Sequence, residues 1–275
     1  DARLPQDVFP GSKRLVRITH HQPASQQVVF NLHVAGHPSY FANGILVHNC
    51  HLIPQEGEGM YRQFLADAKV VNPRLRTIGL TATPFRLKSG MICGPENILN
   101  AVCFEVGVRE LIRDGYLCPL ITKAGRENAN TEQLHVRGGE FVADEVEQLM
   151  DQDQLVESAC REIVEQTRDR NACLIFASGV KHAQHIQAVL QEKYGVECGF
   201  VCGQTPAGER EELLARFRDQ PSDGLFERKP LKYLVNVNVL TTGFDAPNID
   251  CVALLRPTLS PGLWYQAVGR GFRLH

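Results

Sequence analysis

The feature that most constrains the fold is an alternation of strand-like and helix-like segments in the second half of the chain. Apolar runs of strand length are separated by stretches with helical patterning. The predicted strands are residues 173–177, 197–202, 233–239 and 251–255, and the predicted helices are residues 180–193 and 206–217. Because strands that alternate with helices are typical of parallel sheets, the sequence predicts an α/β domain with a parallel sheet.

The residue pattern of the stretch before this region changes near residue 50. Before that point the chain consists of short strand-like runs and turns. Asn43-Gly44 between two apolar runs predicts a β-hairpin, since both turn residues need a positive φ. After it, apolar residues at helical spacing predict helices over residues 60–71 and around 108–112, with a short strand at 77–80 between them.

Composition places the chain among ordinary globular proteins. Of its 275 residues, 43% are hydrophobic and 22% are charged, and no run approaches the roughly 18 apolar residues of a membrane span. The net charge of -2 gives no global attraction to nucleic acid, so any such contact must come from local groups. Nine cysteines without a pairing pattern fit a reducing cytosol, and we expect a soluble cytoplasmic protein without a membrane partner.

Three reactive side chains follow the predicted hairpin: His48, Asn49 and Cys50. An asparagine amide can attack its own backbone carbonyl and cut the next peptide bond, if the geometry is held and an adjacent histidine polarises the carbonyl. A cysteine after the asparagine supplies a thiol that can take up an acyl group before that cut. Alone, such a tripeptide is more often accidental than functional, so its context decides.

That context resembles the C-terminal end of an intein. Residues 27–50 read QVVFNLHVAGHPSYFANGILVHNC, which is similar to the last two intein motif blocks. The resemblance makes His48 the penultimate and Asn49 the last intein residue, and Cys50 the first residue of the host protein. It implies a small all-β C-terminal piece of an intein (Hint) domain.

The resemblance to an intein is incomplete. Asn31 stands where many inteins carry Asp, and Pro38 stands where the block has an upstream His, with His37 beside it. The N-terminal half of an intein, with its first nucleophile and its Thr-x-x-His motif, has no counterpart in the chain. We expect that this chain alone does not splice and at most cleaves slowly after Asn49.

Downstream of Cys50, four segments stand in the order of the motifs of superfamily-two DEAD/DEAH-box helicases. They read GLTATP at 79–84, LIFASG at 174–179, NVLTTGFDAP at 238–247 and QAVGRGFR at 266–273, and they resemble motifs III, IV, V and VI. Each is a weak or moderate signal alone, but four in family order at predicted strand ends argue against coincidence. The resemblance implies RecA-like parallel-sheet lobes, with ATP between them and DNA held mainly by its backbone.

The same resemblance assigns roles to individual residues. Arg270 and Arg273 would stabilise the charge that builds up on the γ-phosphate during ATP hydrolysis, a bidentate task for which lysine is a poor substitute. The residues implied for ATP are Gly243, Asp245, Gln266, Arg270 and Arg273. The residues implied for nucleic acid and for coupling it to ATP are Thr81, Thr83, Ser178, Thr241 and Thr242.

Cys50 and His51 belong to the helicase resemblance as well. If splicing joins an upstream Asp-Glu pair to Cys50, the sequence reads DECH, a variant of the DEAH box. The acidic pair of that box positions Mg²⁺ and the attacking water in ATP hydrolysis. Cys50 would then be both splicing nucleophile and third residue of the box. His51 would link the nucleotide site to its neighbours.

We expect the chain to be a piece of a longer reading frame. Residue 1 is Asp, no GxxxxGK[ST] phosphate loop is present, and the chain stops two residues after Arg273. The predicted layout is an intein segment at 1–49, the end of the first helicase lobe at 50–117 and the second lobe at 118–275. The expected partners are single-stranded or branched DNA, the upstream intein half and the first lobe.

The biological role is predicted more loosely. The segments GLTATPFR and IRDGYLCPL resemble the bacterial RadD-type branch of these helicases, which implies DNA repair. Two alternatives stay open: the motor subunit of a restriction-type complex, which shares these motifs, and a splicing relic with an inactive helicase portion. Intact Arg270, Arg273 and Asp245 weigh against the relic.

Other residues that could bind metals or bases have a simpler interpretation. Cys198 and Cys202 lie roughly 13 Å apart on a predicted strand at ~3.3 Å per residue, too far for one zinc ion with bonds of about 2.3 Å, so packing is expected. His182 and His185 are expected on a helix surface. Trp264 is expected to pack, with stacking on a base as the alternative.

Overall fold

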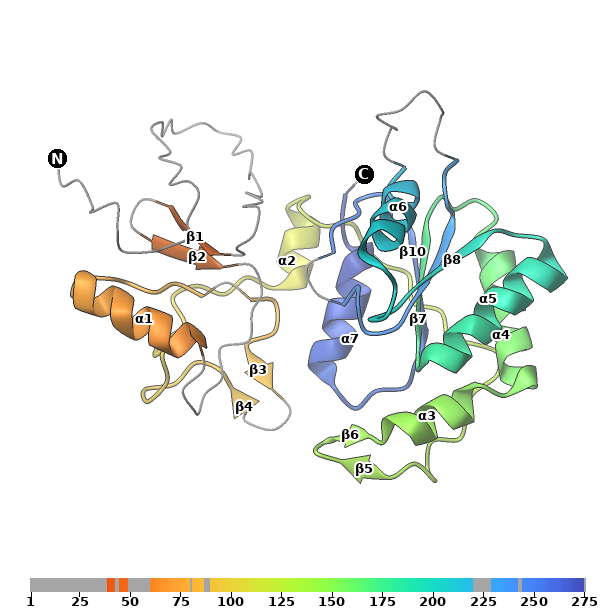
Figure 1. The fold of residues 1–275 in the computed structure, drawn as a ribbon, viewed down its shortest axis with the longest axis horizontal. Coiled ribbons are helices and arrows are strands. Elements are labelled where there is room, and N and C mark those ends of the chain that lie inside the picture. The colour runs from red at the N-terminus through yellow and green to blue at the C-terminus, as the bar shows by residue number, and fades with distance from the viewer. Residues whose placement is uncertain are drawn as a thin grey trace. The chain divides into compact units, whose positions relative to one another are not determined.

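The structure is a computed structural model of the chain. It describes residues 39–42, 45–48, 60–79, 81–86, 90–219, 229–241 and 244–274. Contacts divide the chain into two compact units, residues 1–80 and 81–275, which are described separately (Figure 1). The intein and lobe boundaries expected at residues 49 and 117 stay predictions.

The first unit contains a hairpin and one long helix. Strands β1 (Ser39–Ala42) and β2 (Ile45–His48) pair in antiparallel register, with Tyr40 opposite Val47. This pairing confirms the hairpin predicted around Asn43-Gly44, although the two turn residues lie outside the described residues. The predicted helix is also confirmed, as α1 (Met60–Val71).

The short strand predicted at residues 77–80 is wrong for the part that the structure describes. Only Thr77 takes part in β-pairing, while Ile78 and Gly79 have no regular structure. Ile78 is 48% exposed, so its side chain does not gain the burial that favours a strand. An apolar run this short does not fix its structure by pattern alone.

The second unit is built on a four-stranded sheet in the order β10-β7-β9-β8. The strands are β7 (Cys173–Ala177), β8 (Cys198–Val201), β9 (Tyr233–Asn236) and β10 (Cys251–Leu255). All neighbouring strands are parallel, and Cys173 lies opposite Cys251 on one side and Tyr233 on the other. The predicted α/β class with a parallel sheet is confirmed.

Helices cover both faces of this sheet. They are α4 (Asp153–Gln166), α5 (Val180–Tyr194), α6 (Ala207–Phe217) and α7 (Pro261–Val268), which continues into a 3₁₀ turn (Gly269–Gly271). Helix α3 (Ala143–Met150) packs against α5. Helices α4 and α5 pack on the face that carries Ile175, and α6 and α7 pack on the face that carries Phe176. All five residues of β7 are buried and alternate between these two cores, as expected for a central strand covered on both faces.

The smaller elements lie outside the sheet. Helix α2 (Val108–Arg113) confirms the second predicted helix. Strand β3 (Phe85–Arg86) pairs with β4 (Gly90–Met91), and β5 (Val136–Arg137) pairs with β6 (Glu140–Phe141), both in antiparallel register. The β5–β6 hairpin and α3 precede α4 in the chain, and they contact both the loop before α7 and the start of α5.

Strand β9 ends at Asn236, three residues before its predicted end at residue 239. The buried Asn236 side chain donates a hydrogen bond to the Ile175 carbonyl at 3.0 Å, and Asn238 has a φ of 58°. A left-handed residue cannot continue a strand. The chain therefore turns here, at the carboxyl end of the sheet, and begins the loop that contains Thr241.

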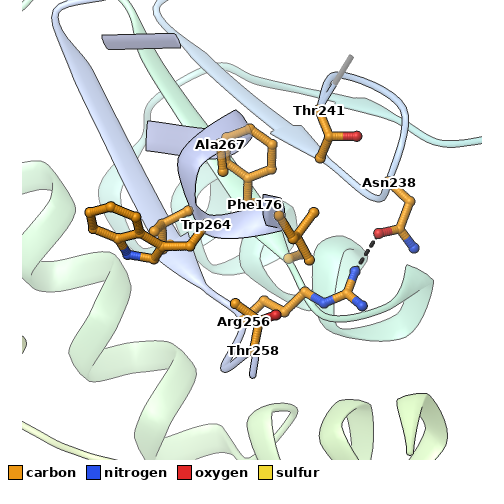
Figure 2. A pocket seen from close by; sticks show the side chains of 10 residues that line it. Phe176, Asn238, Thr241, Arg256, Thr258, Trp264 and Ala267 are labelled. Atoms are coloured by element: carbon orange, nitrogen blue, oxygen red, sulfur yellow. Dashed lines mark hydrogen bonds between the residues drawn. The ribbon is translucent and has the colours of Figure 1, made fainter. Parts of the chain in front are cut away.

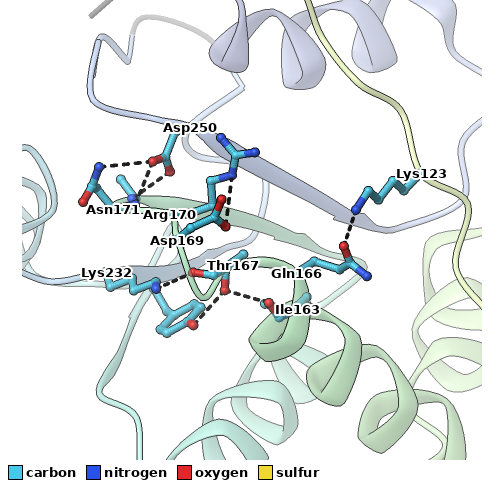
Figure 3. Close-up of polar contacts among 11 residues, drawn as sticks. Lys123, Ile163, Gln166, Thr167, Asp169, Arg170, Asn171, Lys232 and Asp250 are labelled. Carbon is cyan, nitrogen blue, oxygen red and sulfur yellow. Dashed lines mark hydrogen bonds and ion pairs between the residues drawn. The ribbon is translucent and has the colours of Figure 1, made fainter.

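Polar side chains fix the opposite, amino-terminal end of the sheet (Figure 3). The Asp250 carboxylate accepts hydrogen bonds from the backbone N–H groups of Asn171 at 2.7 Å and Ala172 at 3.0 Å, just before β7. The Tyr233 hydroxyl lies 2.8 Å from the buried Thr167 hydroxyl at the end of α4. These contacts connect α4 with the amino-terminal ends of β7, β9 and β10. They therefore fix the positions of these strands, from whose other ends the loops of the opposite edge begin.

Cys198 and Cys202 pack as expected. Both are buried in the core cluster between the sheet and α5. Burial raises the pKa of the Cys198 thiol to about 12, so this side chain is an uncharged apolar group at neutral pH. No group of three or more potential metal ligands occurs among the described residues.

Gly199 in β8 is required by close packing. A Cβ atom there would lie 2.6 Å from Leu231 Cδ2, 3.1 Å from Leu234 Cδ1 and 3.2 Å from Leu213 Cδ2. We expect Gly199→Ala to lower the free energy of unfolding by about 1–3 kcal/mol, because three leucine side chains would have to leave their packed positions to make room for the Cβ atom. Urea unfolding tests this, with Gly208→Ala in α6 as control, since nothing lies within 4 Å of that position. Equal stability of the two variants would contradict the packing argument.

Candidate functional site

The carboxyl ends of the strands in the second unit meet at one edge of the sheet. Ser178 follows β7, Thr241 lies in the loop after β9, and Arg256 follows β10. In open parallel sheets, ligands bind outside the carboxyl ends of the strands. This edge is therefore the candidate functional site.

A small pocket opens at this edge (Figure 2). Its polar and aromatic walls come from Asn238, Thr241, Arg256, Thr258 and Trp264. The Arg256 guanidinium donates a hydrogen bond to the Asn238 side-chain oxygen (Figure 2). This bond ties the segment after β10 to the loop after β9, although no motif in the sequence marks Arg256.

Arg270 is bonded to the loop after β9 through two backbone carbonyls. It lies in the 3₁₀ turn that follows α7, and its side chain is half-buried. One guanidinium nitrogen donates to the Thr241 carbonyl at 2.6 Å, and another donates to the Phe244 carbonyl. The arginine thus bonds to the loop on both sides of residues 242 and 243, which lie outside the described residues.

Two further arginines meet the same loop at Asp245. An Arg273 guanidinium nitrogen lies 2.5 Å from Asp245 Oδ1, and the two side chains are 41% and 44% exposed. Arg218 donates to the Asp245 carbonyl at 2.7 Å and stacks over the Phe244 ring, 4.7 Å from its centroid. Burial lowers the pKa of Arg218 below its usual value, and the nearby Asp245 charge opposes that shift. Cationic groups therefore gather on one loop, with Arg273 accessible to solvent.

Residues 154–275 match the family model of the helicase conserved C-terminal domain. This range holds the complete parallel sheet, the loop with Thr241 and Asp245, and both predicted arginines. Residues 154–275 are therefore similar to a helicase C-terminal domain. Its RecA-like α/β fold agrees with the fold predicted from the sequence motifs.

Comparison with whole proteins points to the same superfamily. The chain is 24% identical over 210 residues to a Saccharomyces cerevisiae protein named as the ATP-dependent helicase IRC3. It is 31% identical over 204 residues to a Schizosaccharomyces pombe protein named as the mitochondrial ATP-dependent helicase irc3. The matches cover 76% and 74% of this chain but 29% and 31% of those proteins, so the chain spans about a third of their length. These matches support a superfamily-two helicase.

A solved structure shares the fold. It is a fragment named as an HsdR subunit of a type I restriction enzyme from Vibrio vulnificus. The match covers 79% of this chain and 39% of that chain, with a TM-score of 0.53 and 22% identity. At this identity the likeness supports the fold alone.

The helicase C-terminal domain brings together some of the predicted site residues. Thr241, Asp245, Arg270 and Arg273 lie on one loop and the turn that supports it. Gln266 is half-buried on α7. The predicted ATP and nucleic-acid contacts of these residues stay predictions.

Other predicted residues lie apart or outside the described residues. Thr81 and Thr83 share one turn, where the Thr83 N–H donates to the Thr81 hydroxyl at 3.0 Å. Of the splicing residues, the structure describes only the backbone of His48. The residues outside the description are Asn49, Cys50, His51, Thr242 and Gly243.

Trp264 is more exposed than a packing residue. Its side chain is 43% exposed, lines the pocket, and meets the Tyr265 ring edge-on with centroids 5.2 Å apart. Packing alone therefore does not account for this side chain.

Two site residues were not predicted from the sequence. Arg218 belongs to no motif and carries no sequence signal, whereas Arg256 could have been found as a charged residue directly after a predicted strand.

Ser178 and His182 form a buried pair, which corrects the expectation that His182 lies on a helix surface. His182 is 1% exposed and Ser178 is 6% exposed, and the Ser178 hydroxyl lies 2.6 Å from His182 Nδ1. Because the Ser178 N–H also points at Nδ1, at 3.3 Å, that nitrogen is an acceptor and the hydroxyl is the donor. The Ser178 hydroxyl thus supports the strand-to-helix turn, and its contact with nucleic acid stays a prediction. The spacing of four residues between Ser178 and His182 is the sequence feature that could have predicted this pair.

Buried His182 predicts a pH dependence of stability. Burial lowers its pKa from 6.5 to about 4, with nearby Asp151 opposing and His185 adding to the shift. The unfolded chain binds this proton at a higher pH than the folded protein does. Stability is therefore full above about pH 6.5 and falls by up to about 3 kcal/mol as the pH drops to about 4.

Urea unfolding of the wild type and of His182→Gln between pH 8 and pH 4.5 measures this effect. The glutamine oxygen can still accept from Ser178 but does not titrate in this range. We expect the stability difference between the two proteins to be constant above pH 7 and to shift in favour of the variant below pH 6. A difference that stays constant over the whole range would contradict a neutral, buried His182.

No helix in the described part of the chain is long and apolar enough to cross a membrane.

Proposed function

We propose that this chain contributes the second lobe of an ATP-dependent superfamily-two motor that acts on DNA. The observation that carries the proposal is the convergence of Arg270 and Arg273 on the loop of Thr241 and Asp245, at the carboxyl edge of the sheet. Charge grows on the γ-phosphate during hydrolysis, and fixed guanidinium groups stabilise it. A phosphate can approach this edge, because Arg273 is part-exposed and is paired with a carboxylate that a phosphate can replace.

The other nucleotide contacts follow from the same arrangement. Gly243, Asp245 and Gln266 would face the nucleotide from the second lobe. Mg²⁺ would be held by the acidic pair of the DECH box, which is not in this chain, and would neutralise phosphate charge when bound. His51, the last residue of the box, would link the nucleotide site to its neighbours.

DNA would be bound through its backbone. Thr241 and Thr242 would meet a phosphate, and Thr81 and Thr83 would couple that contact to ATP. The net charge of -2 favours few, local contacts over a broad basic surface. We place the protein in the RadD-like branch and in DNA repair. A motor subunit of a restriction-type complex, which shares these motifs, is the competing role.

The test is ATP hydrolysis by the full-length protein that contains this chain. We expect hydrolysis that depends on Mg²⁺ and is stimulated by single-stranded or branched DNA, because DNA bound at Thr241 and Thr242 orders the loop that Arg270 supports. Hydrolysis that DNA does not change would contradict a DNA-coupled motor. Cleavage or modification of DNA by the same protein would favour the restriction-type role.

A second function is proposed for the first 49 residues, as the C-terminal segment of an intein. The observation that favours it is the β1–β2 hairpin, whose second strand ends at His48, next to Asn49 and Cys50. A strand that ends at the reactive residues can hold the asparagine amide near its own carbonyl. Cys50 would take up the upstream protein segment as a thioester before Asn49 cyclises.

Tryptic mass spectrometry of the full-length product tests this second function. No Lys or Arg lies between Arg17 and Arg62, so one peptide reports the junction. A peptide in which Asp-Glu is joined directly to Cys50-His51 is the expected product. An unbroken peptide from Ile18 to Arg62 would show an inert insert.

A further inference from the structure

Residues 134–151 link two ends of the helicase domain. This segment contains the β5–β6 hairpin and α3, and Figure 1 shows it running below α5 and α7. One of its carboxylates, Glu140, contacts the loop before α7. Another, Glu147, contacts the start of α5. The segment is therefore bonded to the start of α5, the helix that follows the LIFASG motif. It is also bonded to the loop that leads into α7, the helix in which the QAVGRGFR motif begins.

Glu140 makes two hydrogen bonds to the loop before α7 and one to the next residue of its own strand. Its Oε2 accepts from the Thr258 hydroxyl at 2.5 Å, and its Oε1 accepts from the Leu259 N–H at 2.8 Å and from the Phe141 N–H at 3.0 Å. These bonds, with the Arg256 charge, keep the pKa of Glu140 below its usual value, although burial acts against them as the largest opposing cause. Glu140 is thus an ionised carboxylate whose two longer-range hydrogen bonds both go to the loop before α7.

The contacts continue from Thr258 into helix α7. The Thr258 hydroxyl accepts from the Ser260 N–H at 3.0 Å, and Ser260 is the N-cap whose own hydroxyl accepts from the Leu263 N–H at 3.2 Å. Glu140 is therefore connected by hydrogen bonds, through Thr258, to the N-cap residue of α7. The same loop carries Arg256, which bonds to Asn238 at the start of the Thr241 loop.

Glu147 anchors the other end of the segment. Its Oε1 accepts from the Lys181 N–H at 2.7 Å, where α5 has free backbone N–H groups. A Cβ atom at Gly179 would lie 2.1 Å from this oxygen, so the glycine leaves room for the carboxylate. Because α5 is packed in the core, its bond to Glu147 fixes this end of the segment relative to the sheet.

We infer that Glu140 is a positioning residue for the arginines that act on ATP. Helix α7 is eight residues long and runs directly into the turn with Arg270. A helix of this length is a stiff rod of about 12 Å, so a displacement of its start moves Arg270 relative to the Thr241 loop. Misplacement of a catalytic group by about 1 Å costs up to about 100-fold in rate. This inference rests on the proposed ATPase function.

The experiment compares Glu140→Ala, Glu140→Gln and Thr258→Val in the full-length protein. We expect Glu140→Ala to lower kcat for ATP hydrolysis about 10- to 100-fold, with KM for ATP within about twofold of the wild type. Glu140→Gln keeps an acceptor for the Leu259 N–H and should restore part of the rate. The double variant Glu140→Ala/Thr258→Val should lose no more than the worse single variant, because both break the same contact.

Glu145→Ala is the matched control. Glu145 lies in the same segment and accepts from the His135 N–H at 2.8 Å, and among the described residues its hydrogen bonds stay within the segment. We expect this variant to hydrolyse ATP like the wild type. Hydrogen exchange adds a readout that is independent of ATP: exchange should rise at residues 258–265 in Glu140→Ala and stay unchanged in β7.

The outcomes separate this inference from the proposed function. An unchanged kcat in Glu140→Ala would overturn a positioning role. The same holds if the loss of kcat comes with a matching rise in KM and with faster hydrogen exchange throughout the domain, since that result indicates general destabilisation. If the wild type does not hydrolyse ATP, the proposed function fails, and hydrogen exchange alone decides on Glu140. In that case unchanged exchange at residues 258–273 in Glu140→Ala would overturn the inference.

Discussion

Arg270→Ala in the full-length protein is expected to lower kcat for ATP hydrolysis by about 10³-fold while the Kd for ATP changes little. An arginine that stabilises charge on the transferring phosphoryl group acts mainly in the transition state, so its loss affects kcat more than binding. The structure adds a second cause. Arg270 bonds to the Thr241 and Phe244 carbonyls, so its removal also frees the loop that should meet DNA.

Two comparisons sharpen this prediction. Arg270→Lys keeps the charge but cannot span both carbonyls, and we expect it to recover only a small part of the rate. Arg168→Ala removes an exposed guanidinium from the same domain and should leave kcat unchanged. Single-turnover hydrolysis and equilibrium binding of ATP give the two quantities separately. Equal losses of ATP binding and hydrolysis in Arg270→Ala would contradict the role of Arg270.

Cys50→Ala is expected to abolish joining of the two host segments in the full-length precursor. An alanine has no thiol to take up the upstream segment, so the covalent intermediate cannot form. Gel electrophoresis and intact-mass measurement of the expressed protein report the joined and unjoined species. Normal joining in Cys50→Ala would contradict the assignment of the nucleophile.

The same substitution separates the two roles of Cys50. In a protein produced already joined, Cys50→Ala turns the DECH box into DEAH, which still has both acidic residues. We expect this protein to retain most of its ATP hydrolysis. Loss of hydrolysis there would show that Cys50 does more in the box than fill its third position.

Much of the second unit could be predicted from its sequence, because burial dictates the pattern. Residues 173–177 are apolar throughout and form a strand buried on both faces, where few other residue types are tolerated. The strand expected at 77–80 failed because a short apolar run has no such constraint, and Ile78 is half-exposed. The end of β9 was missed because Asn238, a residue that tolerates positive φ, gives a weak signal inside an apolar run.

The site was predicted only where a motif fixes residue types at fixed spacing. Arg270 and Arg273 could be found in this way, and the structure brings both to the Thr241 loop. Glu140 could not, because its contacts with Thr258 and Leu259 join residues more than a hundred positions apart. His182 was placed on the surface because helical spacing alone does not show which face of α5 meets the sheet.

The central claim is that the loop of Thr241 and Asp245 and the turn of Arg270 complete an ATP site. Hydrogen exchange of the full-length protein with and without ADP and aluminium fluoride, a mimic of the transferring phosphoryl group, tests it most directly. We predict slower exchange at residues 241–246 and 269–273 with the mimic, and less slowing with ADP alone. Unchanged exchange in both segments, with binding of the mimic confirmed in the same sample, would contradict the account.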